Sequence, residues 1–416
     1  MDQHGISKLD LKRQNRMQVL KILKQRGPTS RIDIATTLEL TRAAVTIITN
    51  EMIEQGIIVE IGEYKHVTEK APRGRKKILI DINHNYKFAL GVCIEEDIAS
   101  VGLSTLSGAV LDKRNLTVTD KTQYRDIYEF VKLSASEVLS DNCLNRAHLL
   151  GVGFAVIPTM YERLGVKMTQ SGPDYTKLRA AVGEFTKLPV VFDNSVKGTA
   201  MANIDFQKTK DPNRHNIAFL QFGNTLNFVV TNLNDPIISY DNRTDFVDKM
   251  IINPFSTILD ENGRRGTAKS ELSPAGILGM VRDFYSAENT PYLFKRTNGN
   301  PALIDISLIS DAYQKGDRML DHCMEYKAEL FAVLINNLYF STNPQKIVLH
   351  NFMRDAQELE SVFREKIKSI AGETVSSKID GSIIEEKNRF LSGCALAIRE
   401  LFFTRGGFGT HDFTAK

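Results

Sequence analysis

Residues 29–61 read TSRIDIATTLELTRAAVTIITNEMIEQGIIVEI, and this stretch decides the fold of the first part of the chain. The apolar positions of residues 32–38 have the spacing of a helix face, and Thr29-Ser30 is suited to cap that helix. After a short turn at Glu39-Leu40, Thr41 is a good N-cap for a second helix that runs to about Gln55. Two helices joined by so short a turn predict a helix-turn-helix.

A further helix and two strands flank this stretch. Apolar residues with helical spacing predict a helix over residues 8–26, which Gly27-Pro28 stops. Residues 57–61 and 77–82 predict two paired strands. The polar loop between these strands ends in a run of basic residues and one glycine. Residues 1–82 therefore predict a winged helix-turn-helix DNA-binding domain.

The second helix of such a domain enters the major groove of DNA, led by its amino-terminal residues. Arg42 can donate two hydrogen bonds to a guanine edge, and threonine and alanine offer methyl groups to thymine. The wing tip can place cations in the minor groove or on phosphates. The residues predicted to contact double-stranded operator DNA are Thr41, Arg42, Ala43, Ala44 and Thr46 on the helix, and Arg73, Gly74, Arg75 and Lys76 at the wing tip. The alternative is a protein-interaction module in which Arg42 only solvates the start of a helix.

Charge is distributed unevenly along the chain, whose formal net charge is +3. Residues 1–82 carry 15 Lys and Arg against 10 Asp and Glu, whereas the remainder carries 38 against 40. A basic first part on a slightly acidic remainder indicates that the first part meets a polyanion. A small excess of basic residues like this one also occurs on protein surfaces where it serves only solubility.

Composition indicates a globular protein of two or three domains: 416 residues, 42% hydrophobic and 25% charged. No run of 18 apolar residues predicts a membrane helix, and the first residues lack the basic-then-apolar pattern of a leader. Four cysteines are scattered without C-x-x-C spacing, so neither a disulfide framework nor a cysteine-rich zinc site is expected. These features favour a cytoplasmic protein without contact to a membrane.

Strands and helices alternate after residue 83. Predicted strands cover 88–94, 98–106, 109–118, 149–157, 189–193, 217–222, 226–231 and 346–350. Predicted helices cover 121–139, 273–287, 302–315, 317–341, 354–370 and 385–403. This order predicts an α/β body of two lobes around a cleft. We expect lobe one over residues 83–194, completed by the carboxy-terminal helix within 385–416, and lobe two over 195–384, with oligomer contacts and an effector cleft.

Several local motifs stand in a recognisable order. They are GVGFAV at 151–156, FDN at 192–194, KMIINP at 249–254, NPQKIVL at 343–349 and GCALA at 393–397. Nearly the whole chain thus resembles the ROK family (repressors, open reading frames and kinases) of the actin-like ATPase superfamily. The resemblance implies a two-lobed sugar-kinase-like body, and the winged head implies the repressor branch of the family.

The departures from the family's kinases concern catalysis. The kinases begin lobe one with Asp-x-Gly-Gly-Thr, whose glycines admit ATP phosphates, and the matching stretch here is Cys93-Ile94-Glu95-Glu96-Asp97. Three carboxylates repel phosphate, and we expect this stretch to be a solvated turn. The position of the general base is occupied by Ser195, whose hydroxyl cannot take a proton from a sugar near neutral pH. No catalytic residue and no cofactor is therefore expected.

The family's zinc site is also replaced. Its histidine matches Lys249, and its three cysteines match Asp260, Asn262 and Thr267. These residues do not form the thiolate and imidazole set that zinc prefers, so no metal is expected.

Asp193, Asn194 and Lys249 remain as candidate ligand-binding residues. Asp193 and Asn194 follow an apolar strand, and the carboxyl ends of strands open onto ligand crevices in α/β sheets. The alternative for both is a strand-end cap. Lys249 would favour an anionic ligand such as a sugar acid or phosphosugar, unless it faces solvent. The family's sugar-contacting glutamate falls at Phe246.

The leading hypothesis is a transcription regulator of carbohydrate-related genes, a repressor in the first instance and an activator as the alternative. It would bind operator DNA as a homodimer or homotetramer, because a winged helix reading a palindrome needs two heads. A sugar or phosphosugar effector in the cleft would change the spacing of the heads. One alternative is an effector-independent DNA-binding protein that uses the body only to oligomerise. Another is a carbohydrate kinase with an accessory head.

Overall fold

The computed structural model describes residues 8–63, 77–170, 172–207, 216–232, 244–352 and 357–408. The chain divides into two compact units, residues 1–213 with 384–416 and residues 214–383, which are described here one at a time. The sequence predicts a change of lobe after Asn194, whereas the division falls after Asn213. Helix α6 (Ser195–Asp205) stays with the first unit because it is buried along its whole length and packs on α14 (Leu391–Ile398).

The first unit begins with the predicted winged helix-turn-helix, hereafter the head. Its elements are α1 Lys8–Arg26, β1 Thr29–Ser30, α2 Arg31–Leu38, α3 Arg42–Glu54, β2 Ile58–Glu63 and β3 Ile78–Ile82. The strands form a small antiparallel sheet in the order β1-β3-β2. Leu20 and Leu23 of α1 pack in its core with Ile34, Val45 and Ile80, all of them buried. The three predicted helices and two predicted strands are confirmed, while β1 was not predicted.

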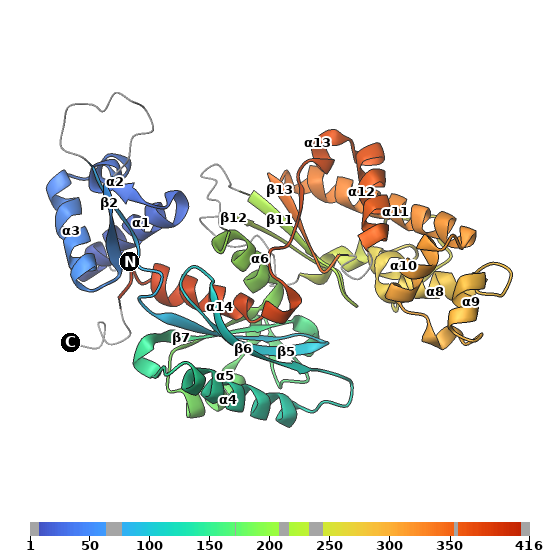
Figure 1. Ribbon diagram of the computed structural model, residues 1–416, viewed down its shortest axis with the longest axis horizontal. Helices are drawn as coiled ribbons and strands as arrows, with labels where there is room; N and C mark the ends of the chain where they lie inside the picture. Colours follow the sequence, from blue (N-terminus) through green and yellow to red (C-terminus); the bar gives the residue numbers. More distant parts are fainter. Residues whose placement is uncertain are drawn as a thin grey trace. The chain divides into compact units, whose positions relative to one another are not determined.

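A five-stranded sheet forms the body of the first unit, and Figure 1 shows it with its flanking helices. Its strands are β4 Phe88–Ile94, β5 Ile98–Ser104, β6 Val110–Thr117, β7 Leu149–Val156 and β10 Val190–Asn194. Their order is β10-β7-β4-β5-β6, with β4, β5 and β6 antiparallel and β7 and β10 parallel to β4. Shorter elements are η1 Arg146–His148, η2 Pro158–Met160, β8 Lys167–Thr169, β9 Gly172–Asp174 and η6 Glu386–Asn388.

Helices cover both faces of this sheet (Figure 1). Helices α4 (Tyr124–Asp141) and α5 (Thr176–Thr186) pack on one face and α14 lies on the other. Glycines let α14 approach: a Cβ at Gly153 would lie 1.9 Å from the carbonyl oxygen of Gly393. The predicted helix over 385–403 is α14 together with the π-helical turn η7 (Arg399–Phe403).

The second unit contains a four-stranded sheet with β11 at its centre. Its strands are β11 Asn216–Gln221, β12 Asn227–Asn232, β13 Lys346–His350 and β14 Ile379–Gly381, in the order β12-β11-β13-β14. Its helices are η4 Asp245–Lys249, α7 Ala268–Leu272, α8 Pro274–Phe284, α9 Pro291–Arg296, η5 Pro301–Leu303, α10 Ile306–Gln314, α11 Arg318–Thr342, α12 Gln357–Ala371 and α13 Glu373–Ser376. The long helix α11 carries much of the core, in which Phe331 is buried beside Phe363. The predicted α/β class with an amino-terminal head is thus confirmed.

The helices of the described part of the chain include none that is both long and apolar enough to cross a membrane.

Candidate DNA interface and candidate effector site

The turn between α2 and α3 is built by two residues at its ends. Glu39 closes α2 in the left-handed region with φ 55°, and its N–H donates to the carbonyl of Ala35. Thr41 then caps α3, because its hydroxyl oxygen accepts from the N–H of Ala44 at 3.2 Å. These two bonds set the direction in which α3 leaves the turn.

The start of α3 is the exposed surface that the sequence predicts as the DNA contact. Thr41, Arg42, Ala43 and Thr46 are exposed, and Ala44 is half-buried. Among the described residues, Arg42 has no ion-pair or hydrogen-bond partner for its side chain. Ile47 is 63% exposed on the same helix and was missed, since an isoleucine in a helix is ordinarily read as core. The five predicted helix residues therefore lie together on one surface.

Arg31 holds α3 against its neighbours. Its guanidinium donates to the Thr49 hydroxyl at 3.0 Å, to Asn50 at 3.2 Å and to the Glu60 carboxylate at 2.9 Å. It thereby joins α2, α3 and β2 and fixes the orientation of α3. This role of Arg31 was not predicted, because its partners lie up to 29 positions away in the sequence.

The predicted wing-tip residues Arg73, Gly74, Arg75 and Lys76 lie outside the described residues. The next residue, Lys77, pairs with Asp33 at 2.8 Å beside the N-terminus of α2. The hydrogen bond from Lys77 is the largest cause of a lowered pKa of Asp33.

Two sets of contacts join the head to the body of the first unit. In the first, buried Arg16 donates to the carbonyl of Gly406 at 2.9 Å and to Gln55 at 2.8 Å, and lies 3.9 Å from the ring of Phe408. Gly406 has φ 65°, and a Cβ there would lie 2.9 Å from the carbonyl oxygen of Arg13. The segment after η7 therefore needs a glycine at this position.

In the second set, the carboxylate of Asp205 binds two cations. It lies 2.8 Å from Lys24 of α1, and Arg399 donates two hydrogen bonds to it at 2.6 and 2.9 Å. Burial raises the pKa of Asp205, but the charges of Arg399 and Lys24 outweigh burial and bring the pKa down to about 2. Lys24 also lies 4.4 Å from the ring centre of Phe403. We call Lys24, Asp205 and Arg399 the joint triad.

Helix α6 begins at the two predicted ligand residues of the first unit. Asn194 is buried, and its side-chain oxygen accepts from the N–H of Val196 at 2.8 Å as the N-cap of α6. Asp193 is partly exposed and lies 3.6 Å from the ammonium group of Lys197. Lys197 was missed, although its spacing of four from Asp193 is that of a helical ion pair.

Two tyrosines lie close enough to Asp193 to feel its charge, Tyr161 and Tyr175. Tyr175 stacks on Phe192 at 5.1 Å, and its hydroxyl lies 2.8 Å from that of Tyr161. Burial, with a contribution from the charge of Asp193, raises the pKa of Tyr161 to about 12. A carboxylate, an ammonium group and two phenol hydroxyls beside aromatic rings are groups that bind a small polyhydroxylated molecule.

Comparison with known proteins identifies several regulators. A xylose repressor from Caldicellulosiruptor bescii is 21% identical over 406 residues, which cover 94% of this chain and 97% of that protein. The N-acetylglucosamine repressor of Escherichia coli O6:H1 is 34% identical over 122 residues, or 29% of each chain. A relative from Caldicellulosiruptor sp. strain Rt8B.4 that is named as a xylose repressor is 23% identical over 193 residues. The matched part spans about half of that protein's length, 47%. No family model matches the chain.

A solved ROK family transcriptional regulator, a homolog of the Escherichia coli MLC protein, matches with a TM-score of 0.68 and 18% identity over 95% of this chain and 98% of that one. The chain has the ROK fold. A ROK family glucokinase from Streptomyces griseus matches 75% of this chain and 99% of its own, with a TM-score of 0.56 and 14% identity. The resemblance that the sequence predicts is thereby confirmed.

At the position of the ROK kinases' phosphate glycines, the predicted solvated turn is wrong for Glu95. Glu95 is buried and accepts from the equally buried Arg389 at 2.8 Å, and Arg389 also binds Asp97 at 2.6 Å. A buried carboxylate in water-poor surroundings requires such a partner. Nearby, at the position of the ROK base, the hydroxyl of Ser195 is buried and has no hydrogen-bond partner among the described residues.

The third predicted ligand residue lies in the second unit. Lys249 ends η4 and is exposed, and its ammonium group lies 3.8 Å from the carboxylate of Asp245. Phe246 packs edge-on against Phe228 at 5.8 Å. Asp248 lies between Phe246 and Lys249 in the sequence and was not predicted; it is buried and accepts from the N–H of Leu226 at 2.7 Å.

Asp248→Asn is expected to stabilise the second unit increasingly as pH rises. Burial raises the pKa of Asp248 to about 7, above its unfolded value of roughly 3.9. The folded wild type therefore holds a proton that the unfolded chain loses, and its stability falls from about pH 4 to pH 7. At pH 8 we expect a gain of roughly 2–4 kcal/mol over wild type in urea unfolding. Asp245→Asn is the exposed control, and an Asp248→Asn gain that is equal at pH 5 and pH 8 contradicts the assignment.

Other side chains occupy the positions of the ROK zinc ligands. Asp260 accepts from the N–H groups of Asn262 and Arg264, both at 2.9 Å, and pairs with the Arg264 guanidinium at 2.8 Å. Thr267 caps α7 through the N–H of Ser270. Within the described ranges, no group of three His, Cys, Asp or Glu side chains is placed to hold a metal ion.

Proposed function

We propose that the protein is a DNA-binding transcription regulator, and specifically a repressor of carbohydrate-related genes. The observation that carries this proposal is the start of α3, where Arg42 stands exposed on a helix oriented by Arg31. A helix-turn-helix presents such a surface to the major groove. The relatives named as xylose and N-acetylglucosamine repressors support the same function.

Arg42→Ala is expected to weaken specific DNA binding by roughly 1–3 kcal/mol, because it removes a side chain able to make two bonds to a guanine edge. The operator is found first, by selecting duplexes from a randomised library with the wild-type protein. Affinities of wild type and variant for the selected duplex are then measured by fluorescence anisotropy at fixed salt.

The matched control is Arg125→Ala, an exposed arginine on α4. It removes the same charge from the body and should leave the affinity unchanged. If both variants lose affinity equally, Arg42 contributes only charge. If the library yields no preferred duplex, the head is an interaction module and the proposal fails.

As part of this function, we propose that the body has no kinase activity. The Glu95–Arg389 pair occupies the place where ROK kinases admit phosphates, and Arg389 is already bound by carboxylates. Ser195 offers a hydroxyl where those kinases use a carboxylate base. A coupled assay with ATP and common hexoses, pentoses and amino sugars should stay at background. Turnover that is abolished by Asp193→Ala would refute this part.

We further propose that a sugar or sugar derivative binds at Asp193, with Lys197 and Tyr161 beside it. Asn194 serves this site by capping α6 rather than by facing the ligand. Helix α6 offers a route from the site to the head, because its 11 residues end at Asp205 of the joint triad. A helix of that length spans roughly 16 Å as a rigid body. Lys249 remains a predicted contact for an anionic ligand.

An effector-independent regulator is the competing function. Thermal-shift screening of neutral and anionic sugars separates the two: stabilisation that Asp193→Ala abolishes supports an effector, and none with any sugar supports the alternative. We also propose a homodimer or homotetramer, since a symmetric operator is bound by paired heads. Light scattering of the full chain tests this, and a monomer that still binds the selected duplex contradicts it.

A further inference from the structure

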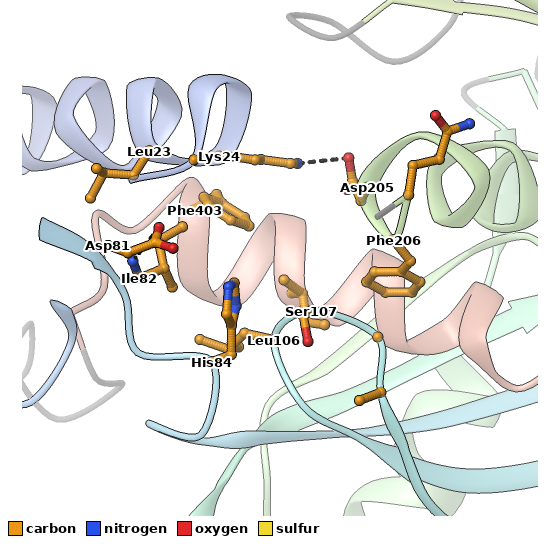
Figure 2. A pocket seen from close by; sticks show the side chains of 15 residues that line it. Leu23, Lys24, Asp81, Ile82, His84, Leu106, Ser107, Asp205, Phe206 and Phe403 are labelled. Carbon is orange, nitrogen blue, oxygen red and sulfur yellow. Dashed lines mark hydrogen bonds and ion pairs between the residues drawn. The ribbon is translucent and has the colours of Figure 1, made fainter. Parts of the chain in front are cut away.

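A cavity of about 340 Å³ lies in the first unit where the head meets the body (Figure 2). Its volume falls in the range of small-molecule sites, roughly 300–1,000 Å³. Neither the DNA surface nor the site at Asp193 includes any of its lining residues. His84 and Ala109 line it and are exposed, so the cavity opens to solvent.

Lining residues from five separate segments converge on this cavity, and Figure 2 shows their side chains. The head contributes Leu23 and Lys24 of α1, together with the end of β3, and the body contributes the β5–β6 turn, the end of α6 and Phe403. The turn packs tightly on α6, because a Cβ at Gly108 would lie 2.2 Å from the Phe206 ring. A molecule in the cavity would therefore contact both head and body.

The charges in the wall favour an uncharged ligand. Lys24 is paired with Asp205 at 2.8 Å, and Asp205 is bound on its other side by Arg399. An anionic ligand would have to break this triad or remain unpaired beside Asp81 and the apolar walls, and both cost free energy. An uncharged molecule enters without disturbing the pairs.

The remaining lining groups favour hydroxyls on an apolar ring. Ser107 presents a hydroxyl, Asp81 a carboxylate and His84 an imidazole. A ligand hydroxyl can donate to the carboxylate, and it can donate to or accept from the serine hydroxyl and the imidazole. Phe206 and Phe403 supply aromatic surface for the apolar face of a ring. The geometry points to a second ligand site here, which binds an uncharged polyhydroxylated ring compound of monosaccharide size.

Such a ligand would hold the head in its docked position. The ligand contacts the head and the body together, so it binds only the arrangement in which the head is docked on the body. Binding therefore shifts the population toward the docked head. This regulatory consequence rests on the proposed function, whereas binding itself does not. The site thus provides control of the head that bypasses Asp193.

The test is titration calorimetry of the full chain with D-xylose, D-glucose and N-acetyl-D-glucosamine, and with glucose 6-phosphate as the charged counterpart. Ala109→Phe fills the mouth of the cavity, Ser107→Leu fills its interior, and Asp193→Ala removes the other site. At least one neutral sugar should bind wild type, and the filling variants should weaken that binding tenfold or more. Asp193→Ala should leave one such binding event intact.

The inference is overturned if neutral sugar binding survives both filling variants. It is also overturned if none of the neutral sugars binds wild type at concentrations up to about 10 mM. The inference likewise fails if glucose 6-phosphate competes with the neutral sugar for this site and binds with equal affinity. If a filling variant misfolds, amide hydrogen exchange of the wild-type protein with and without sugar locates the binding site instead. Protection by sugar at residues 23–27 and 205–207 supports the joint site, and protection confined to 192–197 refutes it. Sugar binding at the joint without any preferred duplex would overturn the regulator proposal and leave the site standing.

Discussion

Asp205→Asn is expected to destabilise the first unit by roughly 3–5 kcal/mol at neutral pH, because it leaves two largely buried cations without their carboxylate. Lys24 and Arg399 lie 2.8 and 2.6 Å from Asp205, with side chains only 17% and 13% exposed. The head should be released before the body unfolds, since Lys24 is one of its anchors. Denaturant unfolding measures the loss, and limited proteolysis at the connection 83–87 detects the released head.

The effect of Asp205→Asn should depend on pH with a defined sign. The folded pKa of about 2 lies below the unfolded value of roughly 3.9. The carboxylate therefore contributes its full stability above about pH 4 and loses it as pH falls toward 2. The difference between wild type and variant should shrink over that window. Asp120→Asn, at an exposed position of the same unit, is the control. Equal stability of wild type and Asp205→Asn at pH 7 would show that the joint triad anchors nothing.

Glu271→Gln is expected to lower the free energy of unfolding of the second unit by a similar amount, roughly 3–5 kcal/mol, because it leaves the buried ammonium group of Lys327 without a carboxylate partner. The two side chains are fully buried and 2.7 Å apart. Asn253 donates to Glu271 at 3.3 Å and to the Tyr326 hydroxyl at 2.6 Å. This network ties the segment that carries the replaced ROK zinc positions to α11. Urea unfolding of the full chain, followed by a probe in the second unit, measures the cost.

Two further variants test the origin of that cost. Glu271→Leu combined with Lys327→Met should recover most of the lost stability, since removing both charges removes the unpaired one. Glu261→Gln breaks the exposed pair with Lys269 and should cost at most about 1 kcal/mol. A metal chelator should leave wild-type stability unchanged. A chelator-sensitive second unit would mean that the segment is held by metal after all.

Local patterns made most of the fold predictable. Helix α1 runs over residues 8–26 as predicted, because a glycine and a proline end it. Helix α6 was not predicted, because all of its residues are buried and the sequence shows no alternation of polar and apolar faces. The π-helical turn after α14 was also invisible, since its i to i+5 bonds leave no distinct residue pattern.

The candidate sites were likewise predictable where their residues are neighbours in sequence and not where the partners lie far apart. The start of α3 was predictable because a cap and its helix are adjacent in sequence. Glu95 was misread as solvated because its partner Arg389 lies 294 positions away. The role of Asn194 as a cap was one of two interpretations of the sequence. The hydrogen bond that its side-chain oxygen accepts from the N–H of Val196, together with its burial, favours the cap over direct ligand contact.

The buried contact of Arg16 has a consequence for the timing of biosynthesis. Gly406 is made 390 residues after Arg16, which at about 5–20 residues per second is roughly 20–80 s later. Until then Arg16 and Ile57 in the head lack the segment that covers them. A chain that has not yet been extended past Gly406 therefore carries an incomplete head. If the head binds DNA as proposed, a new chain should reach its full affinity for DNA only once this segment has been made and has packed onto the head.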